Sequence, residues 1–162
     1  MAVKFRQPHI KELHMSDNKN EFLRDYSLTV NQDVNWGDMD AFGHINNTVY
    51  FRYFENIRMA YFEKTSVNEH KNATQIGPIL ASTQCQFRAP LTYPDHIHIG
   101  TRIKELEKIE QGEKRFTMEY AVFSEQQDCI AAKGEGLIVY YNYNEGKSCA
   151  IPESILAAFK NL

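Results

Sequence analysis

The run from about residue 47 to 65 constrains the fold more than any other part of the chain. Its apolar residues recur at helical spacing and form an unusually broad stripe, made of Tyr50, Phe51, Phe54, Ile57, Tyr61 and Phe62. At 1.5 Å per residue, such a helix is about 28 Å long. Because so wide an apolar surface needs cover on most sides, the pattern predicts a sheet that wraps around the helix.

Alternating patterns on both sides of this helix predict strands. One strand precedes the helix, beginning at Tyr26, with Val34 and Trp36 expected on its apolar side. Four more follow the Gly77-Pro78 pair, at about 79–88, 95–108, 114–124 and 129–142. Together with a short helix expected after Pro152, this order predicts an α+β domain with an antiparallel sheet.

The chain divides into a short tail and one domain. Residues 1–22 are polar, mixed in charge and without a clean period, so we expect a mobile extension there. The remainder, 23–162, has the length of one domain that can bury its own core.

Composition excludes several classes of protein. With a net charge of −3, the chain lacks the basic surplus of nucleic-acid binders, so we expect no nucleic-acid partner. No run of about 18 apolar residues predicts a membrane span, and residues 1–20 do not resemble a signal peptide. The three cysteines form no C-x-x-C pair, which argues against a disulfide framework and a zinc module. We therefore expect a cytoplasmic protein.

The richest chemistry lies in the segment 34–47, between the first strand and the long helix. It holds two carboxylates, a glycine, an imidazole and two amides: Asp38, Asp40, Gly43, His44, Asn46 and Asn47. A helix N-terminus offers unpaired backbone N–H groups and the positive end of a dipole. A carboxylate beside such donors suits acyl transfer, because the donors can stabilise an oxyanion.

These residues also carry a family resemblance. The pattern Asp38-x-Asp40-x-x-Gly43-His44-Ile45-Asn46-Asn47-x-x-Tyr50-x-x-Tyr53-x-Glu55-x-x-Arg58 resembles the signature of hotdog-fold acyl-CoA thioesterases of the 4-hydroxybenzoyl-CoA thioesterase group. The likeness continues more weakly through Phe87-Arg88-Ala89-Pro90-Leu91 and covers about residues 24–142. It implies a hotdog fold, in which a five-stranded antiparallel sheet wraps around a long central helix. It also implies hydrolysis of acyl-CoA without metal or organic cofactor, in a homodimer or dimer of dimers whose pockets form between subunits.

The resemblance gives Asp40 the catalytic role, either as nucleophile or as general base on a water molecule. We expect Asp38 to accept backbone N–H bonds around the turn, and Gly43 to permit a tight turn. The backbone N–H groups near Asn46 and Asn47 would polarise the thioester oxygen.

The remaining candidates each have a plainer alternative. His44 either orients substrate or packs in the turn, and Asn46 binds substrate or caps the helix, with capping favoured. Glu55 is a secondary candidate that we expect to pair with Arg58. Other residues have proposed binding roles: Tyr50 lines the acyl pocket, and Arg88 and Lys133 meet CoA phosphates unless they are ordinary surface charges.

A metal site is not predicted. His96-x-His98 places two imidazoles on one strand face, but the sequence indicates no third ligand. Two other functions stay open: hydrolysis of acyl groups carried by acyl carrier protein, and binding of acyl-CoA without cleavage. The acyl group itself is not readable from the sequence.

Overall fold

The computed structural model describes residues 16–162 and is built on one antiparallel sheet. Five main strands occupy the predicted segments: β1 (Leu28–Asp33), β2 (Ile76–Phe87), β3 (His96–Ile103), β4 (Arg115–Ser124) and β5 (Cys129–Asn142). The strand predicted at 95–108 ends early, because the chain turns into the 3-10 helix Leu106–Lys108. The order of the five strands across the sheet is β1-β3-β4-β5-β2, and every neighbouring pair is antiparallel. A two-residue strand that the sequence did not predict, β6 (Lys147–Ser148), pairs with β5.

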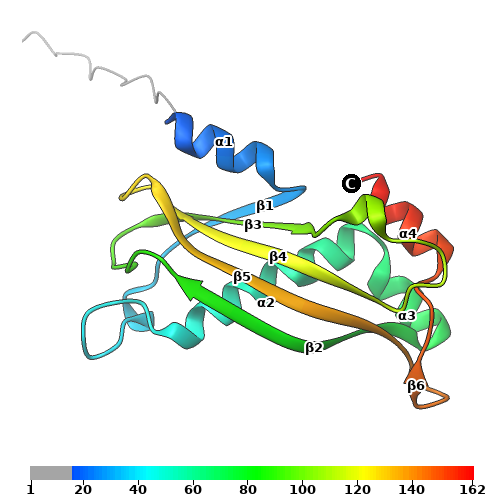
Figure 1. The fold of residues 1–162 in the computed structure, drawn as a ribbon. Coiled ribbons are helices and arrows are strands. Elements are labelled where there is room, and N and C mark those ends of the chain that lie inside the picture. Colours follow the sequence, from blue (N-terminus) through cyan, green and yellow to red (C-terminus); the bar gives the residue numbers. More distant parts are fainter. Residues whose placement is uncertain (1–15) are drawn as a thin grey trace, which may run out of the picture.

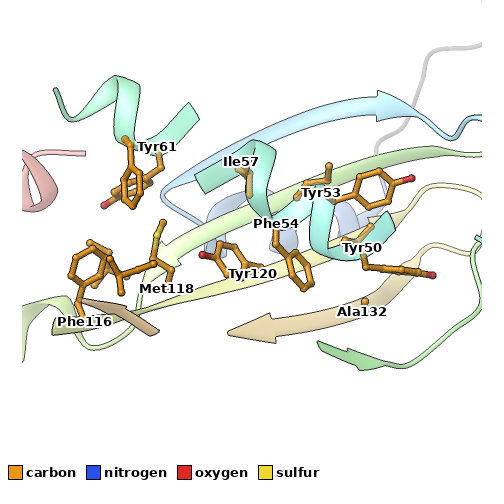
Figure 2. Close-up of a cluster of buried hydrophobic side chains, with 14 of the residues drawn as sticks. Tyr50, Tyr53, Phe54, Ile57, Tyr61, Phe116, Met118, Tyr120 and Ala132 are labelled. Carbon is orange, nitrogen blue, oxygen red and sulfur yellow. The ribbon is translucent and has the colours of Figure 1, made fainter. Parts of the chain in front are cut away.

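The long helix α2 (Asn47–Lys64) lies along one face of this sheet (Figure 1). Its aromatic stripe points into the sheet and meets side chains of β4 and β5, including Phe116, Met118, Tyr120 and Ala132 (Figure 2). The rings of Phe54 and Tyr120 stack with centroids 4.9 Å apart. A Cβ at Gly134 would lie only 2.4 Å from Phe54, so glycine on β5 permits this close approach. The sheet curled around α2 is the hotdog fold.

Two further helices cover the C-terminal end of α2. The predicted helix after Pro152 is α4 (Glu153–Lys160), which buries Ile155, Leu156 and Phe159. The sequence did not predict α3 (Val67–Thr74), whose only buried residue is Val67, because one apolar anchor gives almost no periodic signal.

The opposite face of the sheet is partly covered by α1 (Asp17–Asp25), seen above the sheet in Figure 1. Phe22 is only 2% exposed and packs with Ala121 and Phe123 of β4. The prediction of a mobile extension is therefore wrong for residues 16–22, because a single buried aromatic fastens an otherwise polar helix. Residues 1–15 of that predicted extension lie outside the described residues.

The strand β1 ends before the predicted Trp36. The Val34 N–H donates to the Asp95 carbonyl oxygen at 2.9 Å, and the chain then enters the 3-10 turn Trp36–Asp38. Trp36 is 71% exposed, so the prediction that it shares the apolar side of the strand is wrong. Because β1 ends at Asp33, residues 34–46 form the loop that leads to the start of α2. No helix within residues 16–162 has the length and apolar content needed to span a membrane.

Candidate functional site

The loop between β1 and α2 folds into a closed turn centred on Asp40. The Asp40 N–H donates to the His44 carbonyl oxygen at 2.7 Å, and the Gly43 N–H donates to the Asp40 carbonyl oxygen at 3.0 Å. Gly43 adopts φ +76°, a left-handed conformation that other residues adopt at a cost. Its predicted role in a tight turn is confirmed.

The two oxygens of the Asp40 carboxylate have different surroundings. Oδ1 accepts the backbone N–H of Phe42 at 2.8 Å and, more weakly, that of His44 at 3.4 Å. Oδ2 has no hydrogen-bond or ion-pair partner within residues 16–162. One oxygen therefore fixes the carboxylate in place, and the other is left available for chemistry.

Asp38 supports the same turn in a different way from the prediction. Its main-chain carbonyl accepts the N–H of Asn46 at 2.9 Å, but the prediction that its carboxylate accepts backbone N–H groups is wrong within residues 16–162. Its carboxylate instead accepts the side-chain amide of Asn35 at 3.1 Å. The carboxylate that binds the N–H groups of the turn belongs to Asp40.

The start of α2 presents a free backbone donor. The Asn46 side chain caps the helix by accepting the N–H of Thr48 at 3.0 Å, which confirms the capping interpretation. The Ile45 N–H donates to the Leu91 carbonyl oxygen, and that of Val49 to Asn46. The Asn47 N–H has no acceptor in the described part of the chain.

A cleft of about 360 Å³ unites this helix start with the segment that follows β2. Its walls are formed by Asp40, His44, Ile45, Asn47, Tyr50, Phe87, Arg88, Ala89 and Pro90. Five predicted site residues therefore meet here: Asp40, His44, Asn47, Tyr50 and Arg88. Gly43 and Asn46 shape the turn behind the wall. Within residues 16–162, Asp40 is the only acidic residue that lines the cleft.

The apolar wall of the cleft combines Tyr50 with the end of β2. The Tyr50 ring packs edge to face against the ring of Phe87, the last residue of β2, with centroids 5.0 Å apart. Burial raises the pKa of the Tyr50 phenol, and it raises the pKa of the Cys85 thiol to about 11. Both groups therefore stay neutral at physiological pH; Tyr50 lines the cleft, whereas Cys85 packs against the hydrophobic core. Ala89 and Pro90 also line the cleft. They belong to the weaker motif in the sequence, but no local pattern predicted that they would lie beside Asp40.

Glu55 does not reach this cleft. It lies in a separate hollow of about 250 Å³ between α2 and β2 and pairs with Arg52 at 3.5 Å. The predicted pairing with Arg58 is wrong, because Arg58 is buried and donates to the Tyr120 hydroxyl at 3.2 Å. Spacing along a helix cannot tell which of two nearby arginines turns inward.

Lys133 also lies outside the cleft. It borders a polar hollow of about 160 Å³ on the outer face of the sheet, together with Gln86, Arg102 and Glu119. Within one chain, the two cations proposed for CoA phosphates therefore line different hollows.

The model of the thioesterase-like superfamily matches residues 34–159. A thioesterase of Thermus thermophilus, solved with coenzyme A and Zn, is 26% identical, with a TM-score of 0.69 over 84% of this chain and 93% of that one. A gentisyl-coenzyme A thioesterase is also 26% identical, with a TM-score of 0.67 over 82% of this chain and 99% of that one.

A more distant structure shows the shared fold alone. The 1,4-dihydroxy-2-naphthoyl-CoA thioesterase of Synechocystis is 15% identical, with a TM-score of 0.70 over 83% of this chain and 96% of that one. Since the family match runs from the residue after β1 into the last helix, the chain belongs to the thioesterase-like superfamily and is a thioester hydrolase with the hotdog fold.

Proposed function

We propose that this protein hydrolyses acyl-CoA thioesters to a free acid and CoA, with Asp40 as the catalytic carboxylate. One observation carries the proposal: Asp40 and Asn47 line the same cleft, and within residues 16–162 Asp40 Oδ2 and the Asn47 N–H have no hydrogen-bond partner. The names of the similar proteins support CoA as the thiol, since one is solved with coenzyme A and another is a gentisyl-coenzyme A thioesterase.

In this mechanism the thioester oxygen accepts the Asn47 N–H, which stabilises the charge that develops on it at the positive end of the α2 dipole. As a nucleophile, Asp40 Oδ2 attacks the carbonyl carbon, CoA leaves as thiolate, and water hydrolyses the mixed anhydride. As a general base, Asp40 instead takes a proton from the water that attacks. Both routes yield the acid and CoA.

Different parts of the cleft wall suit the apolar and the charged parts of the substrate. Tyr50 and Phe87 offer an apolar surface to the acyl group near the scissile bond. Arg88 stands on the same wall and offers a guanidinium to a CoA phosphate, for which its fork of donors is suited. His44 is exposed at the rim, where it can orient the substrate.

The test compares Asp40→Asn with Asp38→Asn in a thiol-release assay on short, long and aromatic acyl-CoAs. Asparagine keeps an Oδ1 acceptor for the turn, so the fold should survive in both variants. We expect Asp40→Asn to lower kcat by about 10³-fold and Asp38→Asn to have little effect. Equal activity in the native protein and Asp40→Asn would refute the assignment of Asp40.

Single turnover in ¹⁸O-labelled water separates the two routes. With Asp40 as nucleophile, water that attacks the Asp40 carbon of the mixed anhydride leaves its labelled oxygen in the Asp40 carboxylate and releases an unlabelled acid. A general base leaves the protein unlabelled.

The same assay distinguishes the rival functions. An acyl-carrier thioesterase would hydrolyse acyl-carrier substrates far faster than the matching acyl-CoA. A binding module would retain acyl-CoA in a titration, with no thiol released by either protein.

We also propose that the protein forms a two-fold dimer through β2. This strand of twelve residues is an edge of the sheet and is exposed over most of its length, including Leu80 and Phe87. An open edge of this length favours pairing with another strand. Antiparallel pairing centred on Thr83 would place Phe87 opposite the partner's Ile79, so that each cleft would adjoin the partner's hollow that holds Glu55.

Light scattering of the native protein and of Leu80→Glu tests the dimer. A charge on the edge strand should yield a monomer with reduced thioesterase activity. A native protein that is already a monomer and fully active would refute this part of the proposal.

A further inference from the structure

We propose that His96, His98 and Glu125 form a binding site for a divalent transition-metal ion of the Zn²⁺ type. The three side chains each offer one ligand atom, and these atoms lie within 4.8 Å of one another. The cluster shares no residue with the walls of the Asp40 cleft. It rests on its own geometry and does not depend on the proposed thioesterase mechanism.

The backbone brings these ligands together from distant parts of the chain. His96 and His98 alternate along β3 and so project from the same face of the sheet, with ring centroids 5.5 Å apart. A backbone hydrogen bond holds the turn after β4 beside the start of β3: the Glu125 N–H donates to the His96 carbonyl oxygen at 3.0 Å. Glu125 Oε1 then lies 2.6 Å from His98 Nε2.

The ligand atoms must shift slightly before they can hold one ion. Zinc bonds to nitrogen and oxygen are about 2.0–2.2 Å long, so two ligand atoms on one ion are about 3.4 Å apart in a tetrahedral site. His98 Nε2 and Glu125 Oε1, now 2.6 Å apart, must separate to admit the ion, and rotation of the partly exposed His96 side chain can bring its ligand atom closer.

A second carboxylate orients one of the imidazoles. Asp33 Oδ1, at the end of β1, lies 2.7 Å from His96 Nδ1. In metal sites, a carboxylate on one ring nitrogen fixes the tautomer and makes the other nitrogen a better ligand. His98 is only 7% exposed and therefore already held in place.

A simpler interpretation is an ion-pair network that only fastens α1 to the sheet. In the structure, the ammonium group of Lys19 on α1 contacts the same Glu125 oxygen as His98. The Lys19 ammonium therefore neutralises Glu125 in the place where a metal ion would bind, and the ion would displace it. A metal site predicts Zn²⁺ binding that Lys19→Gln leaves unchanged or tightens, whereas an ion-pair network alone predicts no Zn²⁺ binding in either protein.

The ligand set also selects the kind of ion. Two imidazoles with one carboxylate suit zinc, cobalt or nickel, whereas magnesium and calcium prefer oxygen ligands alone. Three protein ligands leave a fourth position for water. A bound ion would join the end of β1, β3 and the β4–β5 turn through ligands and their partner Asp33.

The test is calorimetric titration of the chelator-treated full chain with Zn²⁺, repeated with Co²⁺ for its visible absorption. Because the chain has other histidines, the background carries His9→Ala and His14→Ala, and His70→Ala serves as a matched control. We expect one equivalent of metal, a loss of affinity of about 100-fold in His96→Ala and of about tenfold in Asp33→Asn. His70→Ala should have no effect.

Lys19→Gln provides the deciding comparison. A metal site predicts equal or tighter Zn²⁺ binding, because a competing positive charge is removed. Zn²⁺ should also raise the melting temperature of the native chain but not that of His96→Ala. Absence of binding, equal Zn²⁺ affinity in the native chain and His96→Ala, or weaker binding in Lys19→Gln would each overturn the proposal.

Discussion

The two ends of α2 differ sharply, although they belong to one helix and one aromatic stripe. The C-terminal end is closed, with Tyr61 in contact with Phe159 of α4 at a centroid distance of 5.8 Å. Phe159 also meets Phe116 of β4 at 5.2 Å. The Thr65 hydroxyl donates to the Tyr61 carbonyl oxygen and so completes the last turn. Aromatic packing and this cap close the C-terminal end, although the buried Tyr61 hydroxyl has no hydrogen-bond partner within residues 16–162.

The N-terminal end is open. Its loop exposes large apolar side chains, with Phe42 87% exposed, and the backbone N–H of Asn47 is left free. Such features cost stability and are found at functional sites, where a ligand satisfies them. The closed end therefore holds the helix in place, while the open end remains free to bind and react.

The largest expected effect is a loss of stability at the closed end. Phe159→Ala should lower the free energy of unfolding by about 3–5 kcal/mol, because it leaves a cavity against Tyr61 and Phe116. The same truncation at the open end, Phe42→Ala, should change it by no more than about 0.5 kcal/mol. Urea unfolding measures both. Similar losses in the two variants would remove the difference between the ends.

The next effect concerns catalysis alone. Asn47→Pro removes the free N–H at the first position of α2, where proline is tolerated. Asn46 already has φ −57° and ψ 139°, the extended conformation that a residue before proline requires. We expect kcat to fall by about 10²–10³-fold, the typical cost of one oxyanion donor.

Asn47→Ala is the matched control, because it keeps the N–H and removes only the side chain. It should leave kcat within a few-fold of the native value and should match Asn47→Pro in circular dichroism. If the proline variant retains full activity, the oxygen is stabilised elsewhere.

The smallest effect sharpens the contrast within the closed end. The Tyr61 hydroxyl is buried and has no hydrogen-bond partner among residues 16–162. Tyr61→Phe should therefore stabilise the protein by about 1 kcal/mol, because it removes an unsatisfied polar group. An equally large loss would indicate a partner for this hydroxyl that the structure does not contain.

The pH dependence provides a second measure at the same position. Burial raises the pKa of Tyr61 from 10.0 to about 12, so the folded state favours the neutral phenol. Its contribution to stability is complete below pH 10 and is lost as the pH rises towards 12. The native protein should lose more stability than Tyr61→Phe over this interval, measured by urea unfolding at each pH.

Local patterns were sufficient for the elements that are periodic and for the site that is contiguous. The start of α2, its cap at Asn46 and the five main strands follow from spacing and residue type. Most of the proposed catalytic groups lie within a few residues of one another, so a single segment could reveal them. That Asp40 is the catalytic residue stays a prediction.

Other features were missed because they depend on contacts between distant residues. The docking of Phe22, the separate hollow of Glu55 and the placement of Lys133 outside the cleft each require knowledge of which face a neighbour covers. For His96 and His98, the third candidate ligand lies at residue 125 and is brought close only by the turn after β4.

The sequence by itself determined the α+β order of elements, the aromatic helix and the acyl-transfer motif at its start, because hydrophobic periodicity and capping act over a few residues. Three features became visible only in the folded chain: the free oxygen of Asp40, the position of Arg88 in the cleft wall, and the approach of Glu125 to His96 and His98. These outcomes depend on how the strands pair and pack, and short-range patterns do not encode that pairing.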